Sequence, residues 1–154
     1  MKAVIQRVKS SSVKVDGEVV GSVGEGYLVL LGVMDGDTKA HAELMAAKTA
    51  NLRIFCDEND KMNKSILDID GEILCVSQFT ICADVKKGNR PSFTPSAPPD
   101  TANELYEYYM QCLKNNGVKK VEHGIFGAEM EVSIVNNGPV TILFDTDIWH
   151  VKGV

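Results

Sequence analysis

Side chains able to do hydrolytic chemistry gather at residues 77–80, where the sequence reads Ser77-Gln78-Phe79-Thr80. This polar segment closes a short apolar run, 72–76, whose length and β-branched content predict a buried strand. Thr80 could act as a hydroxyl nucleophile, but a threonine needs a neighbouring base, and the sequence supplies no obvious histidine or carboxylate beside it. A strand-end threonine that only satisfies backbone groups is the alternative, so these residues alone leave its role open.

A second unusual segment, Asn137-Gly138-Pro139-Val140-Thr141, lies between the apolar runs 132–135 and 140–144. An Asn-Asn-Gly sequence between two such runs predicts a β-hairpin turn. Pro139, however, stands where the returning strand should donate a hydrogen bond, and proline has no N–H to donate. A plain hairpin disfavours a proline at that position.

Metal and disulfide chemistry have little support in the sequence. The cysteines show no C-x-x-C spacing and the histidines form no H-x-x-x-H pair, so we expect reduced thiols and no metal site or cofactor. The acidic turn 57–61 resembles a calcium loop only superficially, because Lys61 occupies a ligand position. The residues concerned are Cys56, Cys75, Cys82, Cys112, His41, His123 and His150.

Composition predicts one globular domain. The chain has 154 residues, of which 44% are hydrophobic and 24% charged, and no apolar run approaches the length of a membrane span. We therefore expect a cytoplasmic protein without a membrane partner. A net charge of −5 argues against a protein that coats nucleic acid along its backbone, but not against one that grips an RNA end. Local basic clusters lie at Lys86, Lys87 and Arg90 and at 119–120.

The elements that must position these residues follow from apolar periodicity and turn signals. About eight strands are expected, joined mostly by hairpin signals such as Asp16-Gly17. One helix is predicted from Asp37, as its N-cap, to about Leu52, and a second from 100 or 101 to about 116, opened by a capping box at 101–104. A proline-rich loop, 83–99, precedes the second helix. The predicted fold is α+β, a curved antiparallel β-sheet or barrel with two outer helices.

Several motifs occurring in one order make the chain similar to a known family. They are Gln6-Arg7-Val8, Ser77-Gln78-Phe79-Thr80, Arg90-Pro91-Ser92-Phe93, Gly127-Ala128 before Met130, and Asn137-Gly138-Pro139-Val140-Thr141. Together they closely resemble the D-aminoacyl-tRNA deacylase family, also called D-tyrosyl-tRNA deacylase. The resemblance covers residues 1–146 as a single domain and leaves 147–154 as a C-terminal extension.

The resemblance implies a hydrolase that cleaves the ester between a D-amino acid, or glycine, and the terminal adenosine ribose of tRNA, while rejecting L-aminoacyl-tRNA. It implies a homodimer whose Gly138-Pro139 pair, joined by a cis peptide and held by Arg7, enters the partner's site. Asn137 belongs to that same motif. Residues 77–80 would form the pocket floor, with N–H groups of Phe79 and Thr80 as oxyanion donors. Phe79, Phe126 and Met130 would be walls for the adenosine, with packing in the core as the alternative for Phe126 and Met130.

Two mechanisms and two other functions stay open at this point. Thr80 matches the residue long regarded as the family's nucleophile, but the missing base favours a role for the ribose 2′-hydroxyl, with Thr80 as a positioning hydrogen-bonder. The other functions are a non-catalytic module that binds an RNA end or a protein, and a small-molecule esterase that uses Thr80 covalently. Departures from the family pattern at Ser10, Ser11 and Ile81 remove no residue that the chemistry needs.

Overall fold

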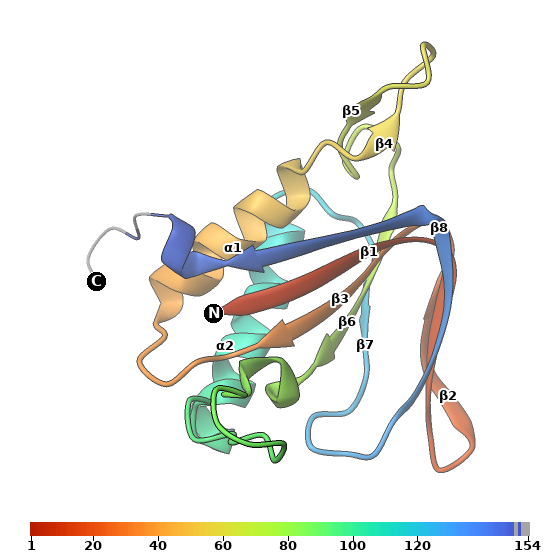
Figure 1. Ribbon diagram of the computed structural model, residues 1–154. Helices are drawn as coiled ribbons and strands as arrows, with labels where there is room; N and C mark the ends of the chain where they lie inside the picture. The colour runs from red at the N-terminus through yellow and green to blue at the C-terminus, as the bar shows by residue number, and fades with distance from the viewer. Residues whose placement is uncertain (150, 152–154) are drawn as a thin grey trace.

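The computed structural model of the chain describes residues 1–149 and Val151 (Figure 1). Residues 150 and 152–154, in the predicted C-terminal extension, lie outside the described residues. The described part contains eight strands, two α-helices and two 3-10 helices. Their order is β1 (Lys2–Val15), β2 (Glu18–Val23), β3 (Gly26–Gly32), α1 (Lys39–Asn51), β4 (Phe55–Cys56), β5 (Met62–Lys64), β6 (Glu72–Ser77), η1 (Phe79–Cys82), α2 (Pro99–Asn115), β7 (Val121–His123), β8 (Glu131–Asp145) and η2 (Thr146–Ile148).

The long strand β1 organises the curved main sheet. Strand β8 runs antiparallel along one edge of β1, while β3 and then β2 pair with its other edge. The β1–β2 connection is the predicted hairpin, since Val15 faces Glu18 and both Asp16 and Gly17 have positive φ, at 51° and 81°. Beyond β3 the sheet continues through β6 to β7.

The α+β class with two helices outside a curved sheet is confirmed, but the sheet is mixed rather than wholly antiparallel. Strand β6 pairs parallel with β3, and β7 pairs parallel with β6. The physical reason is the connection in each case: parallel neighbours require a crossover, and here α1 lies between β3 and β6 and α2 between β6 and β7. Figure 1 shows both helices on the same side of the sheet.

The predicted hairpin at 136–140 is wrong, because β8 is one continuous strand. Both of its halves pair with β1, which is long enough to accept them. The register is interrupted between Thr141, which faces Gln6, and Asn136, which faces Val8. The four residues between them are therefore opposed by Arg7 alone and leave the ladder as a bulge. Figure 1 shows the sharp bend of β8 within its length.

The helices begin one or two residues from where the sequence predicted. Thr38, not Asp37, is the N-cap of α1, and the Thr38 N–H donates to His41 Nδ1 at 3.0 Å. Asp37 instead accepts from the Met34 N–H at 2.7 Å. Helix α2 begins at Pro99, so Thr101 lies inside the first turn and the predicted capping box does not form.

Two apolar cores lie on the two sides of the sheet. The larger fills the space between the sheet and the helices, and the α2 residues Leu105, Tyr109 and Cys112, which helical spacing places on one face, are all buried in it. The smaller lies within the curl of the sheet and includes Val76, with Met130 packed against it. No helix in the described part of the chain is long and apolar enough to cross a membrane.

Candidate functional site

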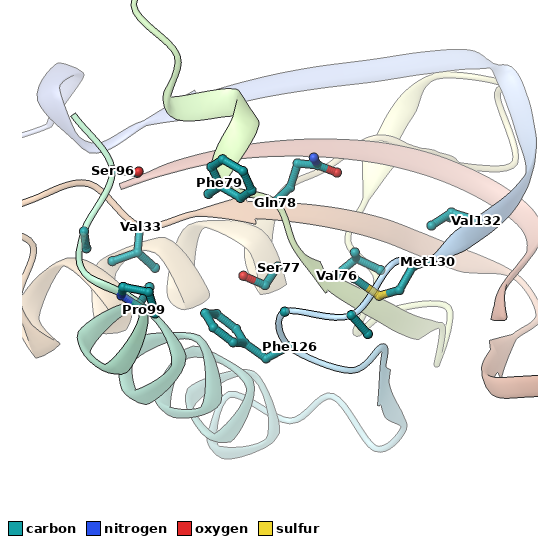
Figure 2. A pocket seen from close by; sticks show the side chains of 14 residues that line it. Val33, Val76, Ser77, Gln78, Phe79, Ser96, Pro99, Phe126, Met130 and Val132 are labelled. Atoms are coloured by element: carbon teal, nitrogen blue, oxygen red, sulfur yellow. The ribbon is translucent and has the colours of Figure 1, made fainter. Parts of the chain in front are cut away.

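A cavity of about 500 Å³ opens where β6 ends and α2 begins, at the boundary between the two apolar cores. Figure 2 shows that its side chains come from four separate parts of the chain. These parts are the end of β6 with η1, the residue after β3, the entry into α2, and the segment that leads into β8 together with the start of that strand. The lining residues are Val33, Val76, Ser77, Gln78, Phe79, Ser96, Ala97, Pro99, Ala102, Phe126, Gly127, Ala128, Met130 and Val132.

The polar floor of the cavity is the predicted segment that follows the apolar run of β6. Ser77 is the last residue of that strand, and the Gln78 N–H donates to the Leu31 carbonyl of β3 at 2.8 Å. The chain then turns into the short 3-10 helix η1, which Phe79 and Thr80 open. Their N–H groups lie in the first turn of η1, where no preceding helical carbonyl is available to accept from them.

Thr80 is exposed and is not among the cavity-lining residues. Its hydroxyl accepts a hydrogen bond from Gln78 Nε2. An amide cannot remove a proton, and within the described residues this is the only side-chain hydrogen bond of Thr80. The structure therefore provides Thr80 with a positioning partner but with no base.

The opposite wall comes from the segment between β7 and β8. Phe126 packs 6.2 Å from the ring of Tyr106 in α2, and Met130 packs against the smaller core. On the near side, Phe79 is 56% exposed and meets Phe93 edge to face, with 5.1 Å between ring centroids. Flat apolar groups thus face one another across the cavity, an arrangement suited to an aromatic or sugar ring.

The β8 bulge is the second predicted site segment, and it lies apart from the cavity of its own chain. The Gly138-Pro139 peptide is cis, both residues are exposed, and neither lines the cavity. Arg7 holds the bulge from behind. Although only 8% exposed, Arg7 donates from Nε to the Asn137 carbonyl at 2.9 Å and from Nη1 to the Ile54 carbonyl at 2.6 Å.

Comparison with known proteins identifies the family. The model of the family described as "D-Tyr-tRNA(Tyr) deacylase" matches residues 4–145. The chain belongs to this deacylase family. It is 58% identical over 146 residues to a D-aminoacyl-tRNA deacylase of Aquifex aeolicus, which covers 95% of this chain and 98% of the relative. A D-aminoacyl-tRNA deacylase of Thermosipho africanus is 56% identical over 146 residues, with 95% and 97% covered.

Solved structures share the deacylase-family fold. The structure described as "c-Myc DNA Unwinding Element Binding Protein" superposes with a TM-score of 0.89 at 45% identity and covers 94% of this chain and 98% of its own. A probable eukaryotic D-amino acid tRNA deacylase superposes with a TM-score of 0.79 at 18% identity, covering 93% and 97%. The latter is similar in fold alone. As a member of the deacylase family, the chain is a hydrolase.

The cavity of this deacylase-family member is uncharged. Of its fourteen lining residues in the described part of the chain, none has an ionisable side chain. In the larger core, desolvation raises the pKa of the Cys75 thiol and of Tyr106, whose hydroxyl donates to the Cys75 carbonyl at 2.8 Å. The described residues also contain no group of three or more histidine, cysteine or carboxylate side chains placed to hold a metal ion.

The structure divides the residues predicted for the deacylase site into two groups. Five of them line the cavity, and they are Ser77, Gln78, Phe79, Phe126 and Met130. Five do not, and these are Thr80, Arg7, Asn137, Gly138 and Pro139. Sequence reasoning missed Val33, Ser96, Ala97, Pro99, Ala102 and Val132, although the unusual length of the proline-rich loop 83–99 is a signal that could have pointed to Ser96, Ala97 and Pro99.

Proposed function

We propose that the protein hydrolyses the ester between a D-amino acid, or glycine, and the terminal adenosine ribose of tRNA, and rejects L-aminoacyl-tRNA. The observation that carries this proposal is the uncharged cavity floored by Ser77, Gln78 and Phe79 in a chain of the deacylase family. An uncharged apolar pocket suits the uncharged nucleoside and the ester linkage attached to it. The protein is proposed to work on translation substrates in the cytoplasm and to use no cofactor.

The terminal adenosine is proposed to lie between Phe79 and the Phe126–Met130 wall, because aromatic and apolar side chains are the usual partners of an unpaired base. The ester carbonyl then points to the first turn of η1. There the N–H groups of Phe79 and Thr80 donate to the oxygen that becomes negative when water adds to the carbonyl carbon. Collapse breaks the bond to the ribose 3′ oxygen, which takes up a proton, and releases amino acid and tRNA.

The proton transfers are proposed to use the substrate's own 2′-hydroxyl. The cavity offers no ionisable side chain, and Thr80 is bonded to an amide rather than to a base. A neighbouring hydroxyl held in place by the protein gains from proximity without any catalytic base. Thr80 and Gln78 then act as positioning residues, and no acyl-enzyme forms.

Chiral selection is proposed to come from the partner subunit of a homodimer. D and L esters carry the same groups, so a rigid wall must exclude one of them, and a 10⁴-fold preference requires about 5.5 kcal/mol. Backbone is the stiffest wall available. The Gly138-Pro139 bulge is exposed, absent from the cavity of its own chain and tied to buried Arg7, so it is suited to enter a second copy's cavity.

The test is deacylation of one tRNA charged in parallel with D-tyrosine and L-tyrosine, at catalytic concentrations of the wild-type protein and of Pro139→Ala. We expect rapid loss of the D ester alone with the wild type, and a weaker preference with the variant. Binding of the tRNA end without cleavage of either ester would contradict the proposal in favour of an interaction module. A trapped acyl-enzyme and activity on small esters without RNA would favour an esterase.

A further inference from the structure

An exposed aromatic pair stands beside the cavity and leads away from it. Phe79 lines the cavity, and its ring meets Phe93 edge to face outside, where Phe93 is 36% exposed. Two adjoining exposed rings form a larger apolar patch than the single exposed residues that are normal on a protein surface. The pair therefore offers a flat surface next to the position proposed for the terminal adenosine.

The loop that carries Phe93 is held firmly at its base. Asp84 and Ser92 exchange two backbone hydrogen bonds, at 2.7 and 2.9 Å, which close the segment 85–91 into a projecting tip. On the cavity side, the Ala97 N–H donates to the Val33 carbonyl at 2.9 Å. The tip is thus fixed relative to the cavity, with Phe93 between the two.

Three cations lie on this tip in a protein whose net charge is −5. Lys86, Lys87 and Arg90 are exposed, and within the described residues none of them forms an ion pair. The one carboxylate of the loop, Asp84, accepts from the Lys86 backbone N–H at 3.0 Å. The ammonium and guanidinium groups of the tip can therefore bind an anionic group of another molecule.

The second basic pair of the chain is different. Lys119 lies 3.3 Å from Asp70, and Lys120 lies 3.5 Å from Glu72, so both ammonium groups are already paired. Both lysines are exposed, as Lys86 and Lys87 are. The two lysine pairs are therefore matched in residue type and exposure, but among the described residues only Lys119 and Lys120 are paired with carboxylates.

We propose that the surface formed by Phe79, Phe93 and the tip 85–91 is a track for the single-stranded RNA that precedes the terminal adenosine. A base of this single strand stacks on the exposed aromatic pair. The phosphates farther from the terminal adenosine lie against Lys86, Lys87 and Arg90. This inference rests on the proposed function and extends the same site. It explains how an acidic protein holds a polyanion, because the contact is confined to one projecting loop.

The test compares two D-tyrosyl esters, one of full-length tRNA and one of adenosine alone, as substrates of K86Q/K87Q and of the control K119Q/K120Q. For the tRNA ester we expect K86Q/K87Q to raise KM with kcat unchanged, and to flatten the dependence of log KM on log salt by about 1.4 for two phosphate contacts. Between about 50 and 200 mM salt, the rise in KM of the wild type should therefore be about sevenfold larger than that of K86Q/K87Q. The adenosine ester and the control variant should behave as the wild type.

The other outcomes distinguish failure of the RNA track from failure of the proposed function. Equal salt slopes for K86Q/K87Q, K119Q/K120Q and the wild type would overturn the track while leaving the deacylase proposal intact. A rise in KM for the adenosine ester as large as for the tRNA ester would also overturn it, since the effect would then lie in the cavity. A wild-type protein that cleaves neither ester would overturn the proposed function itself.

Discussion

The cavity and the β8 bulge are built in opposite ways from one chain. The cavity is concave, uncharged and assembled from four segments that the two cores hold together. The bulge is convex and exposed, comes from a single strand, and has one buried arginine behind it. If the cavity binds the substrate and the bulge excludes the L form, as proposed, the difference is expected: a binding cavity needs several elements around it, whereas an excluding wall needs only stiff backbone.

The separation has a consequence for how activity and selectivity respond to change. If the cavity binds the ester and the bulge of a second copy excludes the L form, damage to the cavity should abolish turnover. Damage to the bulge should instead relax selection while turnover of the D ester persists. The following variants test that division, beginning with the largest expected effect.

Filling the cavity floor should have the largest effect. In Ser77→Leu the added carbons would occupy space where the ester must lie, so we expect D-tyrosyl-tRNA deacylation to fall about 100-fold or more, as misplacement of a reacting group by an ångström does. Ser77→Ala, which removes only the hydroxyl, is the control and should keep most of the rate. Similar rates for Ser77→Leu and the wild type would place the chemistry elsewhere.

Reshaping the bulge should relax selection rather than turnover. Gly138 has a φ of +132°, and an added Cβ would lie 2.9 Å from Arg7 Nη2 and from Val140 Cγ2. Gly138→Ala should therefore displace the bulge and lower the D-to-L ratio of kcat/KM about tenfold or more, which is at least 1.4 kcal/mol. Gly17→Ala, also at positive φ but with open space around it, is the matched control and should leave the ratio unchanged.

A mixing experiment tells whether the bulge acts in the partner's site. The double variant Ser77→Leu/Gly138→Ala, co-expressed with wild type, has a blocked cavity and a displaced bulge. Neither parent homodimer should cleave L-tyrosyl-tRNA. Mixed dimers should cleave L-tyrosyl-tRNA only if the displaced bulge of the double variant enters the cavity of the wild-type chain. Random pairing of equal amounts makes half of the dimers mixed, and one of their two sites has the wild-type cavity, so about a quarter of all sites are of this kind. Absence of L-ester cleavage in the mixture would assign the bulge to its own chain.

Weakening the support of the bulge should have an intermediate effect. Arg7→Lys keeps the charge but loses the planar fork that reaches both the Asn137 and the Ile54 carbonyls. We expect the free energy of unfolding to fall by about 1 to 2 kcal/mol and D/L selectivity to fall about threefold. The control is Arg53→Lys, since exposed Arg53 hydrogen-bonds only Asn63 among the described residues, and its free energy of unfolding in urea should change by less than about 0.5 kcal/mol.

The smallest effect is expected at Thr80. Because its partner is Gln78 rather than a base, Thr80→Ala should reduce D-tyrosyl-tRNA deacylation only about threefold. Single-turnover kinetics with D-tyrosyl-tRNA measure this directly. A loss of about 1000-fold or more, with an intact fold, would instead make Thr80 the nucleophile.

Local patterns in the sequence determined the parts whose causes are local. The Asp16-Gly17 hairpin formed as predicted because two residues with positive φ suffice to reverse a strand. The buried face of α2 formed because helical spacing alone places Leu105, Tyr109 and Cys112 on one side. The strand that ends at Ser77 was equally clear from its apolar run. The order of the family motifs also pointed to residues 77–79, which line the floor of the cavity.

Only the tertiary structure decided features that depend on distant partners. Turn signals at 136–138 predicted a hairpin, yet β1 offers both halves of β8 a partner, and those pairings outweigh the local turn. The parallel pairings of β6 follow from crossovers that no local pattern reveals. The uncharged cavity exists because Val33, Val76 and Phe126, far apart in sequence, line one space where the two cores adjoin.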